Sequence, residues 1–313
     1  MSETEFDKIA IIGIGLLGSS IAHAVKAYGG AKSVALWDLS DEVRDRARKL
    51  LPGEVTDTAA NAVKDAECVI LCTPVGVLAN VTADLKTDLQ PGAILTDVGS
   101  VKAKAAEDMA VHCPDQVHLI PGHPIAGTEK SGPEAGFASL FQDAWHILTP
   151  RPGGDAAYDA AVARLQAFWQ RLGARVERME AERHDRVLAI TSHLPHLIAY
   201  NIVATAYDME RVEEGEVVKY SAGGFRDFTR IAASDPTMWR DVFLSNKAAV
   251  LETLGRFSED LAALQRAIRW DDGDTLMREF SRARGIRKAI IDAGLDTAEA
   301  DFGRRQKDSS AEE

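Results

Sequence analysis

The sequence predicts an α/β protein, with a Rossmann-type, doubly wound parallel sheet in its N-terminal half and an all-helical second half. A short apolar strand at residues 8–12 leads directly into a glycine-rich turn, and further apolar strands recur at the spacing of alternating strands and helices. From Glu180 onward the chain keeps a helical periodicity. Since 313 residues suffice for two domains, we predict a sheet domain at residues 1–178, a helical domain at 179–302 and a disordered polar tail at 303–313.

The glycine-rich turn predicts a dinucleotide site. Its residues are Gly13, Ile14, Gly15, Leu16, Leu17 and Gly18, and a helical pattern follows them. The glycines allow a tight turn and a close approach of the backbone to a pyrophosphate, which the helix N-terminus would face. A second strand, residues 33–37, ends at Asp38, and an acid at this distance from the turn binds ribose hydroxyls. Its charge would repel a 2′-phosphate, which favours NAD over NADP, although Asp38 could also serve the cap of the helix that begins near Ser40.

Five further strands are predicted at residues 67–72, 93–96, 117–120, 145–148 and 175–178. The turns after the first two carry Thr73 with Pro74, and Ser100, and both turns should open onto the cofactor crevice. Ser100 would bind the nicotinamide or a substrate hydroxyl, or it would simply cap a helix over residues 101–112. Lys102 is ambiguous for the same reason.

His123 is the residue with the strongest indication of chemistry. It lies in the run from Gly122 to Gly132, directly after the predicted strand at residues 117–120. Ligands of open α/β sheets bind beyond the carboxyl ends of the strands, and an imidazole there could accept a proton. The prolines and glycines around it also predict a tight loop in which His123 is only a cap, so the run alone leaves both interpretations open.

The first long helix of the second half carries polar groups inward. His193, Pro195 and His196 interrupt an apolar stripe, and Pro195 lacks the N–H that would bond to the Thr191 carbonyl, which predicts a bend with a free acceptor near His196. His193 fits a hydrogen-bonded core histidine better than His196 does. His184, near the start of the helix, is a cap or a group that supports the site. Neither an HExxH motif nor a carboxylate pair accompanies these histidines, so we predict no metal site.

A segment with flexible glycines and two arginines follows. It contains Gly223, Arg226, Asp227 and Arg230, and arginine binds a carboxylate through two parallel hydrogen bonds. Arg226 could instead pair with Asp227 in solvent, so Arg230 is the better candidate for an anionic substrate. Trp239 lies close by, and helices predicted at 236–270 and 275–293 offer broad apolar faces for a second subunit.

The charge balance limits the kinds of partner. With 36 Lys plus Arg against 48 Asp plus Glu, the net charge of −12 argues against a nucleic-acid or anionic-membrane surface. The acidic N-terminus lacks the features of a signal peptide, and we expect no apolar run long enough to span a bilayer. These features predict a soluble, cytoplasmic protein.

Five ordered motifs together resemble the prephenate and arogenate dehydrogenase family. They are the turn at 13–18, Asp-Val-Gly-Ser-Val-Lys at 97–102, the run at 123–132, Ser-His-Leu-Pro-His at 192–196 and Gly-Phe-Arg-Asp-Phe-Thr-Arg-Ile-Ala at 224–232. The resemblance spans residues 8–290 and implies a homodimeric enzyme of tyrosine biosynthesis that oxidatively decarboxylates a cyclohexadiene with NAD(P). The product is a phenol.

The same resemblance implies roles for individual residues. His123 matches the family's catalytic histidine, Ser100 a serine that orients the substrate hydroxyl and the nicotinamide, and Arg230 an arginine that binds a substrate carboxylate. The remaining positions that match the active site are His184, His196, Gly223, Arg226, Asp227 and Trp239. Loss of a hydride from a carbinol carbon leaves a carbonyl, so a neutral His123 would accept the hydroxyl proton.

Two other functions remain compatible with this plan. A β-hydroxyacid or imine reductase would depend on Lys102 rather than His123, and a non-enzymatic NAD-sensing dimer would bind ligand without chemistry. The sequence leaves the choice between prephenate and arogenate open.

Overall fold

The computed structural model describes residues 4–128, 130–210 and 222–292, so the tail predicted at 303–313 lies outside the described residues. Two compact units are present, one extending to Thr253 and the other beginning at Leu254. The first unit contains the sheets and all residues of the site described below.

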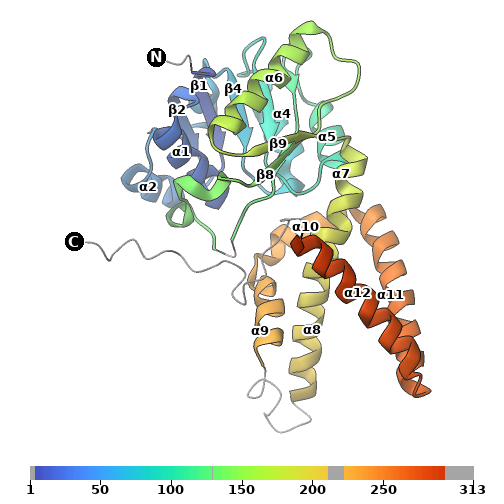
Figure 1. The fold of residues 1–313 in the computed structure, drawn as a ribbon. Coiled ribbons are helices and arrows are strands. Elements are labelled where there is room, and N and C mark those ends of the chain that lie inside the picture. Colours follow the sequence, from blue (N-terminus) through green and yellow to red (C-terminus); the bar gives the residue numbers. More distant parts are fainter. Residues whose placement is uncertain (1–3, 129, 211–221, 293–313) are drawn as a thin grey trace. The chain divides into compact units, whose positions relative to one another are not determined.

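A six-stranded parallel sheet forms the centre of the N-terminal half (Figure 1), as the sequence predicts. Its strand order is β3-β2-β1-β4-β5-β6. The elements are β1 (Phe6–Ile12), α1 (Leu16–Tyr28), β2 (Ala31–Trp37), α2 (Asp41–Leu50), β3 (Glu54–Val55), α3 (Ala59–Val63), β4 (Cys68–Leu71), η1 (Val75–Val77), α4 (Leu78–Leu85), β5 (Ile94–Asp97), α5 (Ala103–Ala110) and β6 (His118–Leu119).

Both faces of this sheet are covered, which explains why β4 and the second half of β1 are continuous apolar runs. In β1, Ile9 and Ile11 pack into one core cluster, whereas the alternate residues Ala10 and Ile12 pack into the other. The carboxyl ends of β1, β4 and β5 therefore emerge together at one edge, where the turns after them meet.

A second, smaller sheet corrects the prediction for His123. Strands β7 (Gly122–Pro124), β8 (Trp145–Leu148) and β9 (Arg175–Arg178) are hydrogen-bonded in that order, with η2 (Pro133–Ala135), η3 (Ala138–Phe141) and α6 (Ala156–Arg171) between them in sequence. His123 lies opposite Ile147 in the antiparallel pair β7–β8 rather than in a loop. The interpretation of His123 as a residue of a tight loop was wrong. Glycine and proline are disfavoured in strands, so the sequence of these three residues does not predict the strand that they form.

The segment between β7 and β8 is attached to α1. The Phe137 N–H donates to Ser20 Oγ at 3.1 Å, and Phe141 is fully buried. A side chain at Gly136 would place its Cβ 2.2 Å from Ser19 Oγ, so only glycine fits there. The part of the chain from η2 to η3 is thereby held against the first half of α1.

The helical half contains α7 (Ala181–Leu188), the π-helix η4 (Ala189–His193), α8 (Leu194–Glu210), α9 (Gly223–Thr229), η5 (Arg230–Ala233), α10 (Pro236–Ser245), α11 (Lys247–Arg269) and α12 (Gly273–Asp292). The single helix predicted at 236–270 is wrong, because the chain breaks at Asn246 between α10 and α11. The bend predicted near Pro195 takes the form of the π-turn η4. The carbonyl that accepts from His196 Nδ1, at 2.8 Å, is that of Ser192 and not the predicted one of Thr191.

One expectation about apolar runs was also wrong. The continuous helical run Ala181–Met209 is long and apolar enough, by length and composition, to cross a membrane. However, its His184 and His193 are fully buried and hydrogen-bonded to protein groups. A helix surrounded by lipid could not keep these contacts.

Candidate active site

The glycine-rich turn has the shape that a dinucleotide needs. Gly13 has a φ of +101°, and a Cβ on it would lie 2.6 Å from the Cys72 carbonyl oxygen. A Cβ on Gly18 would lie 2.1 Å from the Gly13 oxygen, so α1 packs closely against the turn. By contrast, nothing lies within 4 Å of a Cβ built on Gly15. The space above Gly15, at the N-terminus of α1, therefore suits a pyrophosphate.

Asp38 lies beside this turn at the end of β2. Its Oδ2 accepts the Ile14 N–H at 2.8 Å, and its Oδ1 accepts the Ser40 N–H at 3.0 Å. Ser40 caps α2, so the capping and ribose-binding interpretations of Asp38 are compatible. Arg44 donates to the Asp38 and Leu39 carbonyls and pairs with Asp41, and these contacts hold its guanidinium in place.

Two turns from the parallel sheet border the helical half. Thr73 follows β4 with a buried hydroxyl that has no hydrogen-bond partner, and half-buried Ser100 follows β5. Next to these residues, Val75 and Val101 pack in one apolar cluster with Trp239 of α10. Thr73 and Ser100 thus lie close in sequence to residues that pack against α10.

A buried ion pair holds the turn that contains Ser100 to the strand of His123. Lys102 Nζ pairs with Asp97 Oδ2 and donates to the Gly122 carbonyl at 2.8 Å, and both charged side chains are fully buried. Asp97 also accepts the N–H groups of Gly99 and Gly122, at 2.8 and 3.3 Å. With its ammonium group occupied in this way, Lys102 has a structural role, which disfavours a reductase that depends on it.

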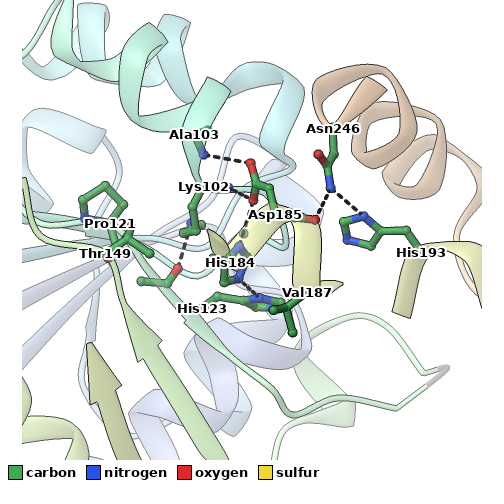
Figure 2. A network of polar contacts seen from close by, with 12 residues as sticks. Lys102, Ala103, Pro121, His123, Thr149, His184, Asp185, Val187, His193 and Asn246 are labelled. Carbon is green, nitrogen blue, oxygen red and sulfur yellow. Dashed lines mark hydrogen bonds and ion pairs between the residues drawn. The ribbon is translucent and has the colours of Figure 1, made fainter. Parts of the chain in front are cut away.

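His123 is the first of three polar side chains that contact one another in a row (Figure 2). Its Nδ1 lies 2.8 Å from His184 Nε2, and His184 Nδ1 lies 2.8 Å from Asp185 Oδ1. The resemblance implies a substrate contact for His184, but His184 is fully buried and both of its ring nitrogens face protein groups. His184 therefore supports His123 from behind.

Asp185 also caps α5. Its Oδ1 accepts the Lys102 N–H at 2.8 Å, and its Oδ2 accepts the Ala103 N–H at 2.9 Å. Ser100 is therefore not the N-cap of this helix, which begins at Ala103. The cap comes instead from the helical half of the chain, 83 residues away in sequence.

His193 is held by Asn246, at the break between α10 and α11. The Asn246 amide donates to the Asp185 carbonyl at 2.8 Å and lies 3.1 Å from His193 Nδ1. Burial lowers the pKa of His193 to about 4. His193 is thus a neutral core histidine, as the sequence predicts.

The pKa of His123 is held well below the usual range of a histidine, first by burial and then by the positive charges that His184 and Lys102 can carry. The ring is therefore neutral near pH 7 and can accept a proton. Burial also holds the pKa of His146 well below its usual range.

These three neutral histidines predict a loss of stability in mild acid. Because their pKa values are lowered only in the folded state, the unfolded chain binds more protons below about pH 6.5. At pH 5.5 His123, His146 and His193 together should cost roughly 4 kcal/mol relative to pH 7.5. Urea unfolding at the two pH values measures this difference, and equal free energies of unfolding would contradict it.

Arg230, His196 and Trp239 form the second part of the candidate site. The ring of His196 stacks on Trp239 with centroids 3.7 Å apart, and its Nδ1–H bonds to the Ser192 carbonyl, which leaves Nε2 as an acceptor. Burial lowers the pKa of His196, and Arg230 lies close enough to lower it further. Arg230 is exposed at the start of η5.

The other predicted substrate residues lie on α9. Arg226 and Asp227 have exposed side chains, and nothing lies within 4 Å of a Cβ built on Gly223. The sequence indicated no role for Asp97, Asp185 or Asn246. The position of Asp97 at the carboxyl end of a predicted strand is the sequence feature that could have identified it. Within the described residues, no cluster of His, Cys, Asp and Glu could hold a metal ion.

Two family models match this chain. The model described as "Prephenate dehydrogenase, nucleotide-binding domain" matches residues 21–178, and the one described as "Prephenate dehydrogenase, dimerization domain" matches residues 180–282.

Individual relatives agree with these matches. A cyclohexadienyl dehydrogenase of Zymomonas mobilis is 45% identical over 92% of this chain and 97% of its own length. The crystal structure of the A. aeolicus prephenate dehydrogenase, in complex with hydroxyphenyl propionate and NAD+, has a TM-score of 0.83 at 33% identity, covering 93% of this chain and 99% of that one. For the Synechocystis arogenate dehydrogenase the TM-score is 0.75 at 25% identity, with 91% and 100% covered. The chain belongs to the prephenate dehydrogenase family and is an oxidoreductase.

Proposed function

We propose that this enzyme oxidatively decarboxylates prephenate, arogenate or both, with NAD as the oxidant, in tyrosine biosynthesis. The observation that carries the proposal is the neutral, almost buried His123, which is backed by His184 at 2.8 Å. A cofactor turn precedes it in the chain and an arginine-bearing segment follows it. The relatives named above act, by their names, on cyclohexadienyl compounds, prephenate and arogenate.

His123 accepts and returns one proton. The substrate carries a ring hydroxyl on a carbon that also bears hydrogen, and the hydroxyl proton passes to a ring nitrogen of His123 as that carbon loses a hydride. The bond from the opposite ring carbon to its carboxylate then breaks, CO2 leaves, and the electron pair of the bond makes the ring aromatic. The phenolate oxygen takes back the proton from His123. A positioned base contributes about 10²- to 10⁴-fold to such a step.

Arg230 binds a carboxylate of the substrate, and His196 with Trp239 lines the adjacent wall. A guanidinium is always charged and binds two carboxylate oxygens, so it suits a dianionic or zwitterionic ligand. The ring carboxylate must be held without being stabilised too strongly, because uniform binding does not accelerate its loss. Ser100 orients the ring hydroxyl from the turn after β5.

The residues that would hold NAD are those of the turn at 13–18, together with Asp38, Thr73, Pro74 and Ser100. Bound there, NAD would supply the acceptor for the hydride of the carbinol carbon. The open space above Gly15 supports this assignment, and the Asp38 carboxylate favours the free ribose hydroxyls of NAD over the 2′-phosphate of NADP.

The direct test offers prephenate and arogenate separately, each with NAD and with NADP, and follows the absorbance of the reduced cofactor. We expect reduction with NAD and at least one of the two substrates. Absence of reduction in all four assays would overturn the proposal.

A homodimer is expected to form through the helical half. Apolar side chains that are more than half exposed recur along α11 and α12, including Leu261, Ile268, Met277 and Phe280. Such surfaces are typical of subunit interfaces. Sedimentation analysis at micromolar concentration should give twice the 33.9 kDa mass of the chain, and replacing Leu261 and Phe280 together by serine should shift the population toward the monomer. A monomeric parent protein would contradict this expectation.

A further inference from the structure

The chain of polar contacts behind His123 determines where its proton lies. Asp185 is 5% exposed, and its two oxygens already accept the backbone N–H groups of Lys102 and Ala103. A carboxylate in this position can only accept hydrogen bonds. His184 must therefore carry a proton on Nδ1 to bond with Asp185 at 2.8 Å.

The second contact follows from the first. In the neutral form of His184, a proton on Nδ1 leaves a lone pair on Nε2, which accepts a hydrogen bond. The facing atom, 2.8 Å away, is His123 Nδ1, which must then be the donor. Neutral His123 has only this one proton, so its Nε2 carries a free lone pair.

We propose that Asp185 is a positioning residue that keeps the proton of His123 on Nδ1, through His184, and leaves Nε2 to accept the substrate hydroxyl proton. The effect of Asp185 on catalysis rests on the proposed function, whereas the inferred proton positions on His184 and His123 do not. A base oriented by a third group is the arrangement that activates histidine in nucleophilic triads.

Asp185 is itself held rigidly. The N-terminus of α5 supplies two donors to its carboxylate, and the Asn246 amide donates to its backbone carbonyl at 2.8 Å. The carboxylate comes from α7, whereas the helix it caps follows the turn of Ser100. The alignment of the base and the packing of α7 against α5 therefore depend on the same side chain.

Two variants separate the relay from the cap. Asp185→Ala removes both, whereas His184→Phe breaks the relay and keeps the cap. We expect each to lower kcat by roughly 10²- to 10⁴-fold, with little change in substrate KM, because a wrong tautomer behind a catalytic histidine costs about 10⁴ in such triads. Asp155→Ala is the matched control: Asp155 caps α6 by accepting the Tyr158 N–H at 2.8 Å, away from the site, and its loss should leave kcat unchanged.

The proton positions are measured without turnover. Two-dimensional ¹H–¹⁵N spectra of the imidazole rings in the cofactor-free protein distinguish a protonated from an unprotonated nitrogen, and His123→Gln assigns the His123 signals. We expect Nδ1–H with bare Nε2 in the parent protein, and a gain of Nε2–H in His184→Phe and Asp185→Ala. A parent His123 protonated on Nε2, or a His184→Phe variant with near-normal kcat, would overturn the relay. A parent enzyme that reduces no cofactor would overturn the proposed function and leave the spectroscopic result standing.

Discussion

His123→Gln lowers kcat by about 10²- to 10⁴-fold, the contribution of one positioned general base. Converted at about 1.4 kcal/mol per factor of ten, this is roughly 3–5 kcal/mol of transition-state stabilisation. Glutamine has an amide of similar size but no basic nitrogen, so substrate KM should change far less than kcat. Steady-state kinetics with prephenate and arogenate measure both constants.

The pH profile gives a second readout of the same residue. His123 works as a neutral base, and burial lowers its pKa, so protonation and loss of rate occur only well below pH 6.5. The parent enzyme should keep its kcat/KM through pH 6.5 and lose it at lower pH. This acid limb should be absent from His123→Gln. The control His112→Gln, in the turn after α5, should retain both rate and profile, and a His123→Gln variant with near-parental kcat would exclude His123 as the base.

Much of the nucleotide domain was predictable because its signals are local. The apolar strands at residues 8–12 and 33–37, the glycine turn and Asp38 each follow from neighbours in sequence, and β1 and β2 contain these strands. Strand β7 was not predictable in this way. Its three residues gain strand geometry only by pairing with β8, as in His123 opposite Ile147.

The site shows the same division between local and distant signals. Motifs identified His123, His196 and Arg230, and His184 was expected to be a helix cap or a group that supports the site. The structure brings His184 into contact with His123. The partners that hold these groups could not be read from the sequence, since Asp185 reaches Lys102 across 83 residues and Asn246 reaches Asp185 across 61. The helical periodicity of the sequence also continues through Asn246. The break between α10 and α11 is stabilised by a tertiary hydrogen bond, which the apolar pattern does not reveal.

Lys102→Met should lower the free energy of unfolding by about 3–5 kcal/mol, the usual cost of removing one partner of a buried ion pair. The reason is that Asp97 would remain fully buried without its counter-charge, while the Gly122 carbonyl would lose its donor. Against a typical total of about 5–15 kcal/mol, such a loss is large. Urea unfolding at pH 7.5 measures it. Lys104→Met is the matched control, because Lys104 is half exposed and its pair with Asp108 should contribute about 0.5 kcal/mol or less.

The double variant Asp97→Asn with Lys102→Met tests whether the lost stability comes from the isolated charge. An asparagine buries no charge, and its one amide oxygen can still accept either the Gly99 or the Gly122 N–H, which Asp97 binds with different oxygens, so the double variant should be more stable than Lys102→Met alone. Lys102→Met with parental stability and a greatly reduced kcat would instead assign Lys102 a chemical role, as a reductase of similar plan would require. The ion pair links the turn of Ser100 to the strand of His123. We therefore expect kcat to recover in the double variant to the same extent as the free energy of unfolding recovers.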